Sequence, residues 1–251
     1  MIKLENTEVM GWEAAIRGMR NPMNSWEQSD SGWDESIYHN DKDYITVMSE
    51  DFSDYEVGPN DLDLMKRLHN AGTDHRKFMR MITVYVDITA PLYWWKEFDT
   101  YKVGTVANSC STMHKIADKE FTLDDFSHEH LCDDELALLE EVITRLNMNR
   151  IVFIAKNDKQ VDRYTVMSDE CYAKYKKTLW WQMIQLLPSS YNQRRTVMMN
   201  YEVRANMYKS RKNHKLDEWH TLCDWIKTLP CSQLITGEFD KMEDINNDKN
   251  A

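Results

Sequence analysis

A chain of 251 residues, 42% hydrophobic and 29% charged, can bury a complete hydrophobic core and has the composition of a folded globular protein. Its net charge of −11 disfavours nucleic acid as a partner, because binding to phosphates requires clustered Lys and Arg. No stretch approaches the roughly 20 consecutive apolar residues of a membrane helix, and the N-terminus lacks the apolar core of a signal peptide. We therefore expect a cytoplasmic protein with no membrane segment.

The cysteines and histidines carry no metal signature. The five cysteines are odd in number and widely spaced, without a C-x-x-C pair, which indicates reduced thiols rather than a zinc site or a redox dithiol. His128, His130 and Cys132 alternate in an acidic segment, and no second ligand cluster accompanies them. We predict no catalytic metal.

Six elements are predicted in the first half of the chain. In order they are a helix, a loop, a helix, a strand, a helix and a loop, at 12–19, 21–35, 60–72, 81–89, 92–98 and 104–112. Asn60 or Asp61 is expected to cap the second helix, and Gly72 to end it. The alternating β-branched residues of 81–89 are typical of a half-buried strand.

The second half is predicted to be mainly helical. Four helices and one strand are expected, the helices at 135–150, 169–187, 203–211 and 216–229 and the strand at 195–200. No repeat or flexible linker interrupts the sequence, so we predict a single domain over 1–239 followed by a polar, flexible tail at 240–251.

Basic residues are concentrated in one segment. Between Arg194 and Lys215 there are seven basic residues and one acidic residue, a local net charge of +6 in an acidic chain. On an uninterrupted helix, five residues of this segment would share one polar, cationic face: Asn200, Arg204, Tyr208, Arg211 and Lys215. The face could be a solvated helix surface or an anion pocket. Because the chain has no G-x-G-x-x-G or P-loop motif, a nucleotide would have to be held by side chains.

Two blocks of the sequence are similar to one enzyme family. The first, from Asp61 to Ser111, contains LMKRLHNAGTDH, the strand MITVYVDIT, the step Ala90–Pro91, and the segments KEF, TYKVGT and NSCSTM. The second contains Leu187–Pro188, then Asn200, Asn206, Arg211 and LDEW. In order and spacing, these blocks resemble the motifs of the flavin-dependent thymidylate synthases, enzymes that methylate deoxyuridine monophosphate (dUMP).

The resemblance implies roles for individual residues. Arg211 would meet the pyrimidine edge of the nucleotide and stabilise negative charge there, a task that suits the planar guanidinium fork. The implied cofactor-binding residues are His75, Thr100, Tyr101, Lys102, Asn200 and Asn206. The implied substrate-binding residues are Glu97, Ser111, Arg194 and Arg204. The cofactor would be FAD, which supplies the hydride, with NADPH and methylenetetrahydrofolate as further reactants.

Several residues depart from the family pattern. Thr100-Tyr101-Lys102 stands where the family has Arg-His-Arg, Met113 replaces a phosphate-binding Arg, and Glu97 replaces Gln. Glu202 stands where an Arg follows the first Asn. Each change removes a contact worth about 1.5–3 kcal/mol, and Arg194, Arg195 and Arg204 are candidates to compensate.

The resulting expectation is an α+β or α/β fold with a central, mostly antiparallel sheet and long flanking helices. The family implies a homotetramer with active sites between subunits. The expected function is a flavin-dependent enzyme acting on a pyrimidine nucleotide, by methyl or one-carbon transfer to dUMP or a related base. The alternative is a non-catalytic protein that keeps the fold as a nucleotide-binding or interaction module. Use of the basic segment to bind nucleic acid is disfavoured.

Overall fold

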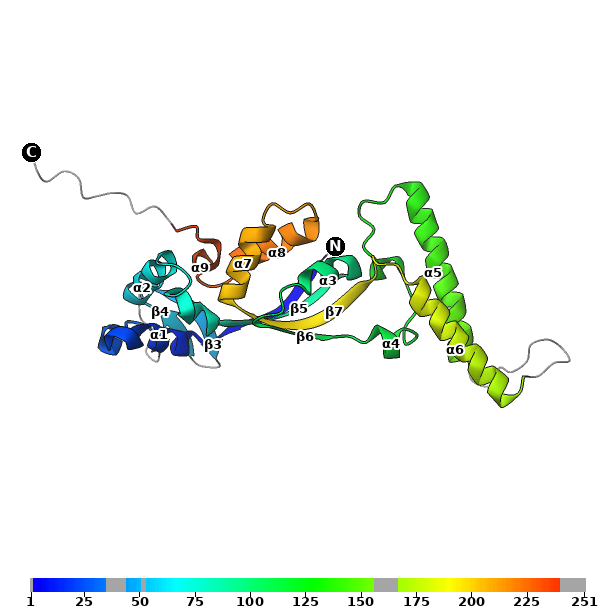
Figure 1. Ribbon diagram of the computed structural model, residues 1–251, viewed down its shortest axis with the longest axis horizontal. Coiled ribbons are helices and arrows are strands. Elements are labelled where there is room, and N and C mark those ends of the chain that lie inside the picture. Colours follow the sequence, from blue (N-terminus) through cyan, green and yellow to red (C-terminus); the bar gives the residue numbers. More distant parts are fainter. Residues whose placement is uncertain (1, 35–43, 51–52, 156–166, 240–251) are drawn as a thin grey trace, which may run out of the picture. The chain divides into compact units, whose positions relative to one another are not determined.

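The computed structural model describes residues 2–34, 44–50, 53–155 and 167–239, which form a mixed fold of helices and antiparallel sheet (Figure 1). Contacts between residues separate two compact units that interleave along the chain. Unit 1 comprises the described residues of Met1–Lys3, Asp87–Thr100 and Ala107–Thr196. Unit 2 comprises those of Leu4–Val86, Tyr101–Val106 and Val197–Ala251. The predicted tail at 240–251 lies outside the described residues, and a single domain over 1–239 stays a prediction.

The larger sheet has four strands in the order β1-β5-β7-β6. These strands are β1 (Lys3–Met10), β5 (Thr83–Pro91), β7 (Asn192–Asn200) and β6 (Thr105–Ser109). The predicted strand at 81–89 is confirmed as β5, in which Val84, Val86 and Ile88 are buried. β6 corrects the prediction of a loop at 104–112. Its side chains are mostly exposed, so it lacks the apolar alternation by which strands are recognised in a sequence.

The smaller sheet was not predicted. Its antiparallel strands are ordered β2-β4-β3: β2 (Gly32–Asp34), β4 (Ser53–Val57) and β3 (Ile45–Glu50). The prediction of a loop over 21–35 is therefore wrong at its end, where β2 begins. Two 3₁₀ turns, Asn21–Met23 and Trp26–Gln28, also fall within it. Three residues without a hydrophobic pattern, as in β2, become a strand only because a partner strand supplies hydrogen bonds.

The helices of unit 2 are α1 (Trp12–Arg20), α2 (Pro59–Asn70), α7 (Tyr201–Arg211), α8 (Asp217–Lys227) and the short α9 (Gln233–Thr236). A 3₁₀ helix, η3, spans Arg76–Arg80. Large side chains fill the core between these elements: Trp12, Met65, Tyr201 and Trp219 are all fully buried. At Gly11, φ is 92°, and a Cβ there would collide with the carbonyl oxygen of Met81. Only glycine therefore fits the start of α1.

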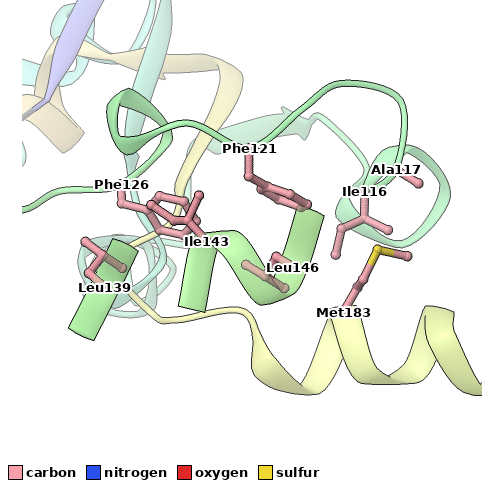
Figure 2. Packing of buried hydrophobic residues seen from close by; sticks show 8 residues of the cluster. All are labelled: Ile116, Ala117, Phe121, Phe126, Leu139, Ile143, Leu146 and Met183. Atoms are coloured by element: carbon pink, nitrogen blue, oxygen red, sulfur yellow. The ribbon is translucent and has the colours of Figure 1, made fainter. Parts of the chain in front are cut away.

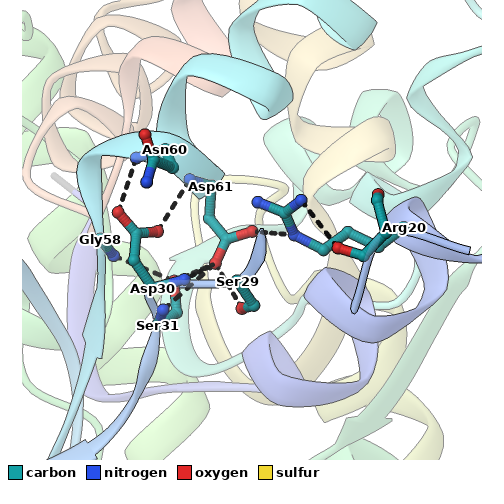
Figure 3. Close-up of polar contacts among 8 residues, drawn as sticks. Arg20, Ser29, Asp30, Ser31, Gly58, Asn60 and Asp61 are labelled. Atoms are coloured by element: carbon teal, nitrogen blue, oxygen red, sulfur yellow. Dashed lines mark hydrogen bonds and ion pairs between the residues drawn. The ribbon is translucent and has the colours of Figure 1, made fainter. Parts of the chain in front are cut away.

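The first turn of α2 is fastened by charged side chains (Figure 3). Its N-cap is Gly58 rather than Asn60 or Asp61, which corrects the predicted cap. The carboxylate of Asp30 instead accepts the backbone N–H groups of Asn60 and Asp61, at 2.8 and 3.0 Å. The buried carboxylate of Asp61 pairs with Arg20 Nε at 2.6 Å and accepts four further hydrogen bonds from Ser29, Asp30 and Ser31.

Unit 1 contains the two longest helices, α5 (Asp133–Ile154) and α6 (Asp169–Leu186), together with the shorter α3 (Leu92–Phe98) and α4 (Thr112–Lys115). Figure 2 shows the aromatic and aliphatic residues of the segment 116–126 packed against α5 and α6. Asn147 fixes this segment, because its side chain accepts from Phe121 N at 2.9 Å and donates to Phe121 O at 2.8 Å. The sequence predicted α3, α5 and α6 at nearly these positions.

No helix in the part of the chain that the structure describes is long and apolar enough to cross a membrane. The same residues contain no group of three or more His, Cys, Asp or Glu side chains that could hold a metal ion.

Candidate functional site

Helix α7 organises most of the predicted site residues of unit 2. Asn200 is its N-cap, and the side chain accepts a hydrogen bond from Val203 N at 2.9 Å. Gly104 lies against this end: a Cβ there would be 3.0 Å from Asn200 Nδ2 and 3.0 Å from Val203 Cγ2. Because Tyr101 contacts the other end of α7, as shown below, the segment 101–104 runs alongside the helix.

The first turn of α7 carries an ion pair that the sequence did not reveal. Arg76 Nε lies 2.9 Å from Glu202 Oε2, and Arg76 Nη2 donates to Glu202 Oε1 at 3.1 Å. Both side chains are largely buried, at 17% and 9% exposure. Glu202 stands where the family resemblance places an Arg, and Arg76 follows the predicted cofactor residue His75. The carboxylate at this position is therefore neutralised by a cation from a neighbouring element.

Arg211, at the other end of α7, is held by aromatic side chains. Its Nε donates to Tyr101 Oη at 2.9 Å. Its Cζ lies 4.5 Å from the ring centroid of Trp219 and 5.6 Å from that of Tyr101. Such stacking is favourable because the ring faces carry negative potential. Tyr101 Oη also lies 2.9 Å from Ser210 Oγ.

The expected five-residue face of an uninterrupted helix is not formed. α7 ends at Arg211, so Lys215 lies beyond it. Arg204 is fully buried and its Cζ lies 4.1 Å from the ring centroid of Trp225. Tyr208 is also buried and donates to Glu238 at 3.1 Å. The predicted face needed a helix that continues to Lys215, but α7 ends four residues earlier. Neighbouring elements cover Arg204 and Tyr208, so these two side chains do not face solvent.

Burial changes the chemistry of Arg204. No described residue accepts a hydrogen bond from its three side-chain nitrogens. Desolvation lowers the pKa of Arg204 to about 9, well below the ordinary value of an arginine, because burial disfavours the charged form. Its guanidinium is enclosed in the core of unit 2, away from solvent.

The remaining predicted residues of unit 2 are exposed. His75, Lys102 and Asn206 all present their side chains to solvent. Together with Asn200 they supply amide, imidazole and ammonium donors on the elements around α7.

The predicted site residues of unit 1 are Glu97, Thr100, Ser111 and Arg194, and they contact other residues of the same unit. Ser111 caps α4 by accepting from His114 N at 3.2 Å. Thr100 Oγ1 donates to the backbone oxygen of Glu97 at 2.7 Å. Arg194 Nη2 donates to Asp87 at 2.6 Å, and Asp87 also accepts from Thr196. The neighbouring Arg195 pairs with Asp99 at 2.7 Å. Part of the basic segment is thus engaged by carboxylates of this unit.

Two hollows in unit 2 are lined by other residues. One, of about 330 Å³, is lined by Lys66, Lys227, Ser232, Gln233, Thr236 and Glu238. The second, of about 210 Å³, lies beside Arg20, Trp26 and Tyr55. Neither includes a predicted site residue.

Solved structures of one enzyme resemble this chain over more than nine-tenths of its length. A crystal structure of the flavin-dependent thymidylate synthase ThyX from Helicobacter pylori, complexed with FAD and dUMP, matches with a TM-score of 0.56 over 92% of this chain and 96% of that one. A second structure of ThyX from the same organism, also with FAD and dUMP, has a TM-score of 0.54 and covers 93% and 96% of the two chains. The chain has the fold of ThyX.

Sequence identity to these ThyX structures is only 14% and 13%. No protein-family model matches the chain, and a search of curated proteins also found no match. The likeness to ThyX therefore establishes the fold and leaves the reaction to be argued from the residues.

Sequence reasoning missed three contributors to the surface around α7. Arg76, Ser210 and Trp219 contact Glu202, Tyr101 and Arg211 respectively. Each lies next to, or within, a motif already singled out: Arg76 follows His75, Ser210 precedes Arg211, and Trp219 ends LDEW. Only their closeness in sequence to these motifs could have indicated the three residues, because none of the three contacts joins residues three or four positions apart.

Proposed function

We propose that this protein is a flavin-dependent enzyme acting on a pyrimidine nucleotide of the dUMP kind. The observation that carries the proposal is the ThyX fold, matched along nearly the whole chain to structures that contain FAD and dUMP. Arg211 supports it, because this residue has the position in the motif and the chemical character that the nucleotide-binding role requires. The reaction proposed is methyl or one-carbon transfer to the pyrimidine base.

The residues around α7 are compatible with FAD. FAD carries a diphosphate, so an unpaired carboxylate in its binding surface would repel it. Glu202 is the acidic residue that raises this concern, and Arg76 neutralises it at 2.9 Å. His75, Lys102, Asn200 and Asn206 are the residues proposed to hold the cofactor through imidazole, ammonium and amide donors. When bound, FAD would supply the hydride, with NADPH as its reductant and methylenetetrahydrofolate as the one-carbon donor.

Arg211 is proposed to bind the pyrimidine edge. A guanidinium presents parallel N–H donors in one plane, which matches a ring carbonyl and its neighbour, and its charge favours an electron-rich base. Glu97, Thr100, Ser111, Arg194 and Arg204 are carried over from the resemblance as further ligand-binding residues. Of these, Arg204 would have to leave its buried position to reach a ligand.

A homotetramer with active sites between subunits is part of the proposal. In its support, α5 and α6 carry several large apolar side chains that are exposed in a single chain: Leu138, Met148, Ile151, Tyr175 and Trp181. Apolar surface of this kind is typical of protein interfaces. We expect light scattering coupled to size-exclusion chromatography to give four times the chain mass of 29.9 kDa. A monomer at micromolar concentration would contradict the assembly.

The function is tested by ligand binding. We expect purified protein to be yellow, or to bind added FAD with a flavin spectrum, and to bind dUMP in calorimetry with FAD present. Arg211→Lys should weaken dUMP binding about tenfold or more, because an ammonium cannot reproduce the fork. Arg145→Lys, an exposed Arg on α5, is the matched control and should leave binding unchanged.

One observation favours a second candidate, a non-catalytic nucleotide-binding or interaction module. Glu202 stands where the resemblance places an Arg, and its charge is balanced by Arg76, so the positive charge available to FAD is lower than in the family pattern. Colourless protein that binds dUMP but does not respond to FAD would support the module and contradict the enzyme.

A further inference from the structure

The hydrogen bonds at the end of α7 have a direction that can be deduced. Ser210 Oγ lies 2.9 Å from Asn206 O and 3.2 Å from Met207 O. Carbonyl oxygens only accept, so the single hydrogen of Ser210 points to the helix backbone. Tyr101 Oη, 2.9 Å from Ser210 Oγ, must then donate its own hydrogen to Ser210.

The same hydroxyl accepts from Arg211. Arginine has no acceptor, so the contact of 2.9 Å between Arg211 Nε and Tyr101 Oη is a donation by the guanidinium. The bonds therefore run in one sense, from Arg211 to Tyr101 to Ser210 to the backbone of α7. The buried ring of Trp219 limits movement on one side, with Arg211 Cζ 4.5 Å from its centroid.

We propose that Tyr101 is a positioning residue that holds Arg211 in one orientation for the nucleotide. The family resemblance places Tyr101 against the cofactor. In this chain, however, the hydrogen of its hydroxyl is donated to Ser210 and the oxygen accepts from Arg211. This inference rests on the proposed function of Arg211 as the nucleotide-binding residue.

A fixed arginine binds more tightly than a free one. Arginine has four rotatable side-chain bonds, and ordering them on binding reduces affinity. The hydrogen bond at Nε and the stacking on Trp219 order the side chain beforehand. Tyr101 stands where the family has His, and this change affects nucleotide binding through Arg211.

The hydrogen bond by which Tyr101 holds Arg211 can be tested without any ligand. In ¹⁵N-detected spectra, the Nε–H of Arg211, assigned by its loss in Arg211→Met, should exchange slowly with water in the unaltered protein. Tyr101→Phe removes the acceptor and should speed this exchange at least tenfold, whereas Tyr175→Phe on α6 should not change it. Equal protection in Tyr101→Phe and the unaltered protein would overturn the proposal.

The consequence for binding is tested by a double-mutant cycle. Tyr101→Phe should weaken dUMP binding about fivefold to tenfold while leaving FAD affinity within twofold. In the Arg211→Met background, Tyr101→Phe should have no further effect on dUMP, because its action passes through Arg211. An equal loss in both backgrounds, or a large loss of FAD affinity, would overturn the positioning role and make Tyr101 a direct ligand.

Failure of the proposed function gives a different result. If the unaltered protein binds no dUMP, the nucleotide assignment fails, and the Nε–H exchange of Arg211 still decides whether Tyr101 orients it. Ser210→Ala provides an independent check, since it removes the acceptor for the phenol and leaves Tyr101 and Arg211 in place. We expect it to give a smaller rise in exchange than Tyr101→Phe, and no change at all would contradict the deduced chain of bonds.

Discussion

Two arginines of unit 2 are both buried, yet they meet very different surroundings. Arg20 is 4% exposed, and its guanidinium donates to Asp61 at 2.6 Å and to Ser25 O at 3.1 Å (Figure 3). Arg204 is completely buried, faces the ring of Trp225, and has no hydrogen-bond acceptor among the described residues. A buried charge is costly unless it is paired. The partners of Arg20 therefore offset the cost of its burial, whereas no hydrogen bond from a described residue offsets that cost for Arg204.

The comparison shows that burial alone does not reveal what a charged residue contributes. Arg20 connects α1 to the segment before β2 and to the first turn of α2. Arg204 gains a cation–π contact, worth about 2 kcal/mol when desolvated, but loses its hydration without replacing it. Arg76, paired with Glu202 and partly exposed, is intermediate between the two.

The largest effect is expected at Asp61. Asp61→Asn replaces one carboxylate oxygen by an amide group that cannot accept, and it leaves Arg20 buried without an ionic partner. We expect the free energy of unfolding to fall by about 3–5 kcal/mol, measured by urea denaturation. Asp63→Asn, in an exposed pair with Arg67, is the matched control and should cost less than about 0.5 kcal/mol. Similar losses in both variants would contradict the contrast between buried and exposed pairs.

A smaller effect is expected at Glu202. Glu202→Gln removes the charge that faces Arg76, but Arg76 keeps some access to water at 17% exposure. The free energy of unfolding should fall by about 1–3 kcal/mol. If FAD binds near this pair, the same variant should raise FAD affinity, because a negative charge is removed from the surface. A loss of affinity would show that the carboxylate itself serves the ligand.

The smallest effect, and one of opposite sign, is expected at Arg204. Arg204→Met keeps the apolar stem and removes the unpaired charge, so near pH 7 we expect stability to rise by about 1 kcal/mol. Arg67→Met, an exposed change, should be near neutral. A loss of more than about 2 kcal/mol in Arg204→Met would mean that the cation is effectively paired.

The gain at Arg204 should depend on pH. Burial lowers its pKa to about 9 in the folded protein, so below pH 9 the side chain is charged in both states and the full cost of burial applies. Above pH 9 the folded protein binds fewer protons than the unfolded chain, whose arginine stays charged, so its stability rises with pH. The advantage of Arg204→Met should therefore shrink above pH 9, which urea denaturation at pH 8 and 10 can measure.

The parts of the fold that sequence predicted are those with strong hydrophobic periodicity. β5 alternates with a period of two, and α5 and α6 carry apolar stripes over many turns, so their local patterns sufficed. β1, β2, β3, β4 and β6 lacked such patterns or were too short, and they form because they pair with other strands. β3 pairs with β4, which follows it directly, whereas β2 reaches β4 from about twenty residues away. The predicted N-cap of α2 was wrong for a related reason, since Asp30 acts from about thirty residues away, whereas Gly72 does follow the end of the helix with a positive φ, as predicted.

The candidate site was predicted only as separate residues. Motif spacing identified Asn200, Asn206 and Arg211, and the structure places the segment 101–104 beside their helix. Spacing could not show that Arg204 points into the core or that Arg76 neutralises Glu202, because both depend on which side of α7 is covered. Whether these residues bind FAD and a pyrimidine nucleotide stays a prediction.

The bonds around Asp61 and Asp30 also bear on how fast backbone hydrogens exchange with solvent. The N–H groups of Asp30 and Ser31 lie in an irregular segment, yet both donate to the buried carboxylate of Asp61 at 3.2 Å. Exchange at these two amides requires the segment to move away from the carboxylate and both bonds to break. In deuterated water, a peptide covering residues 29–34 should therefore take up deuterium as slowly as helix α2, although none of it is helical.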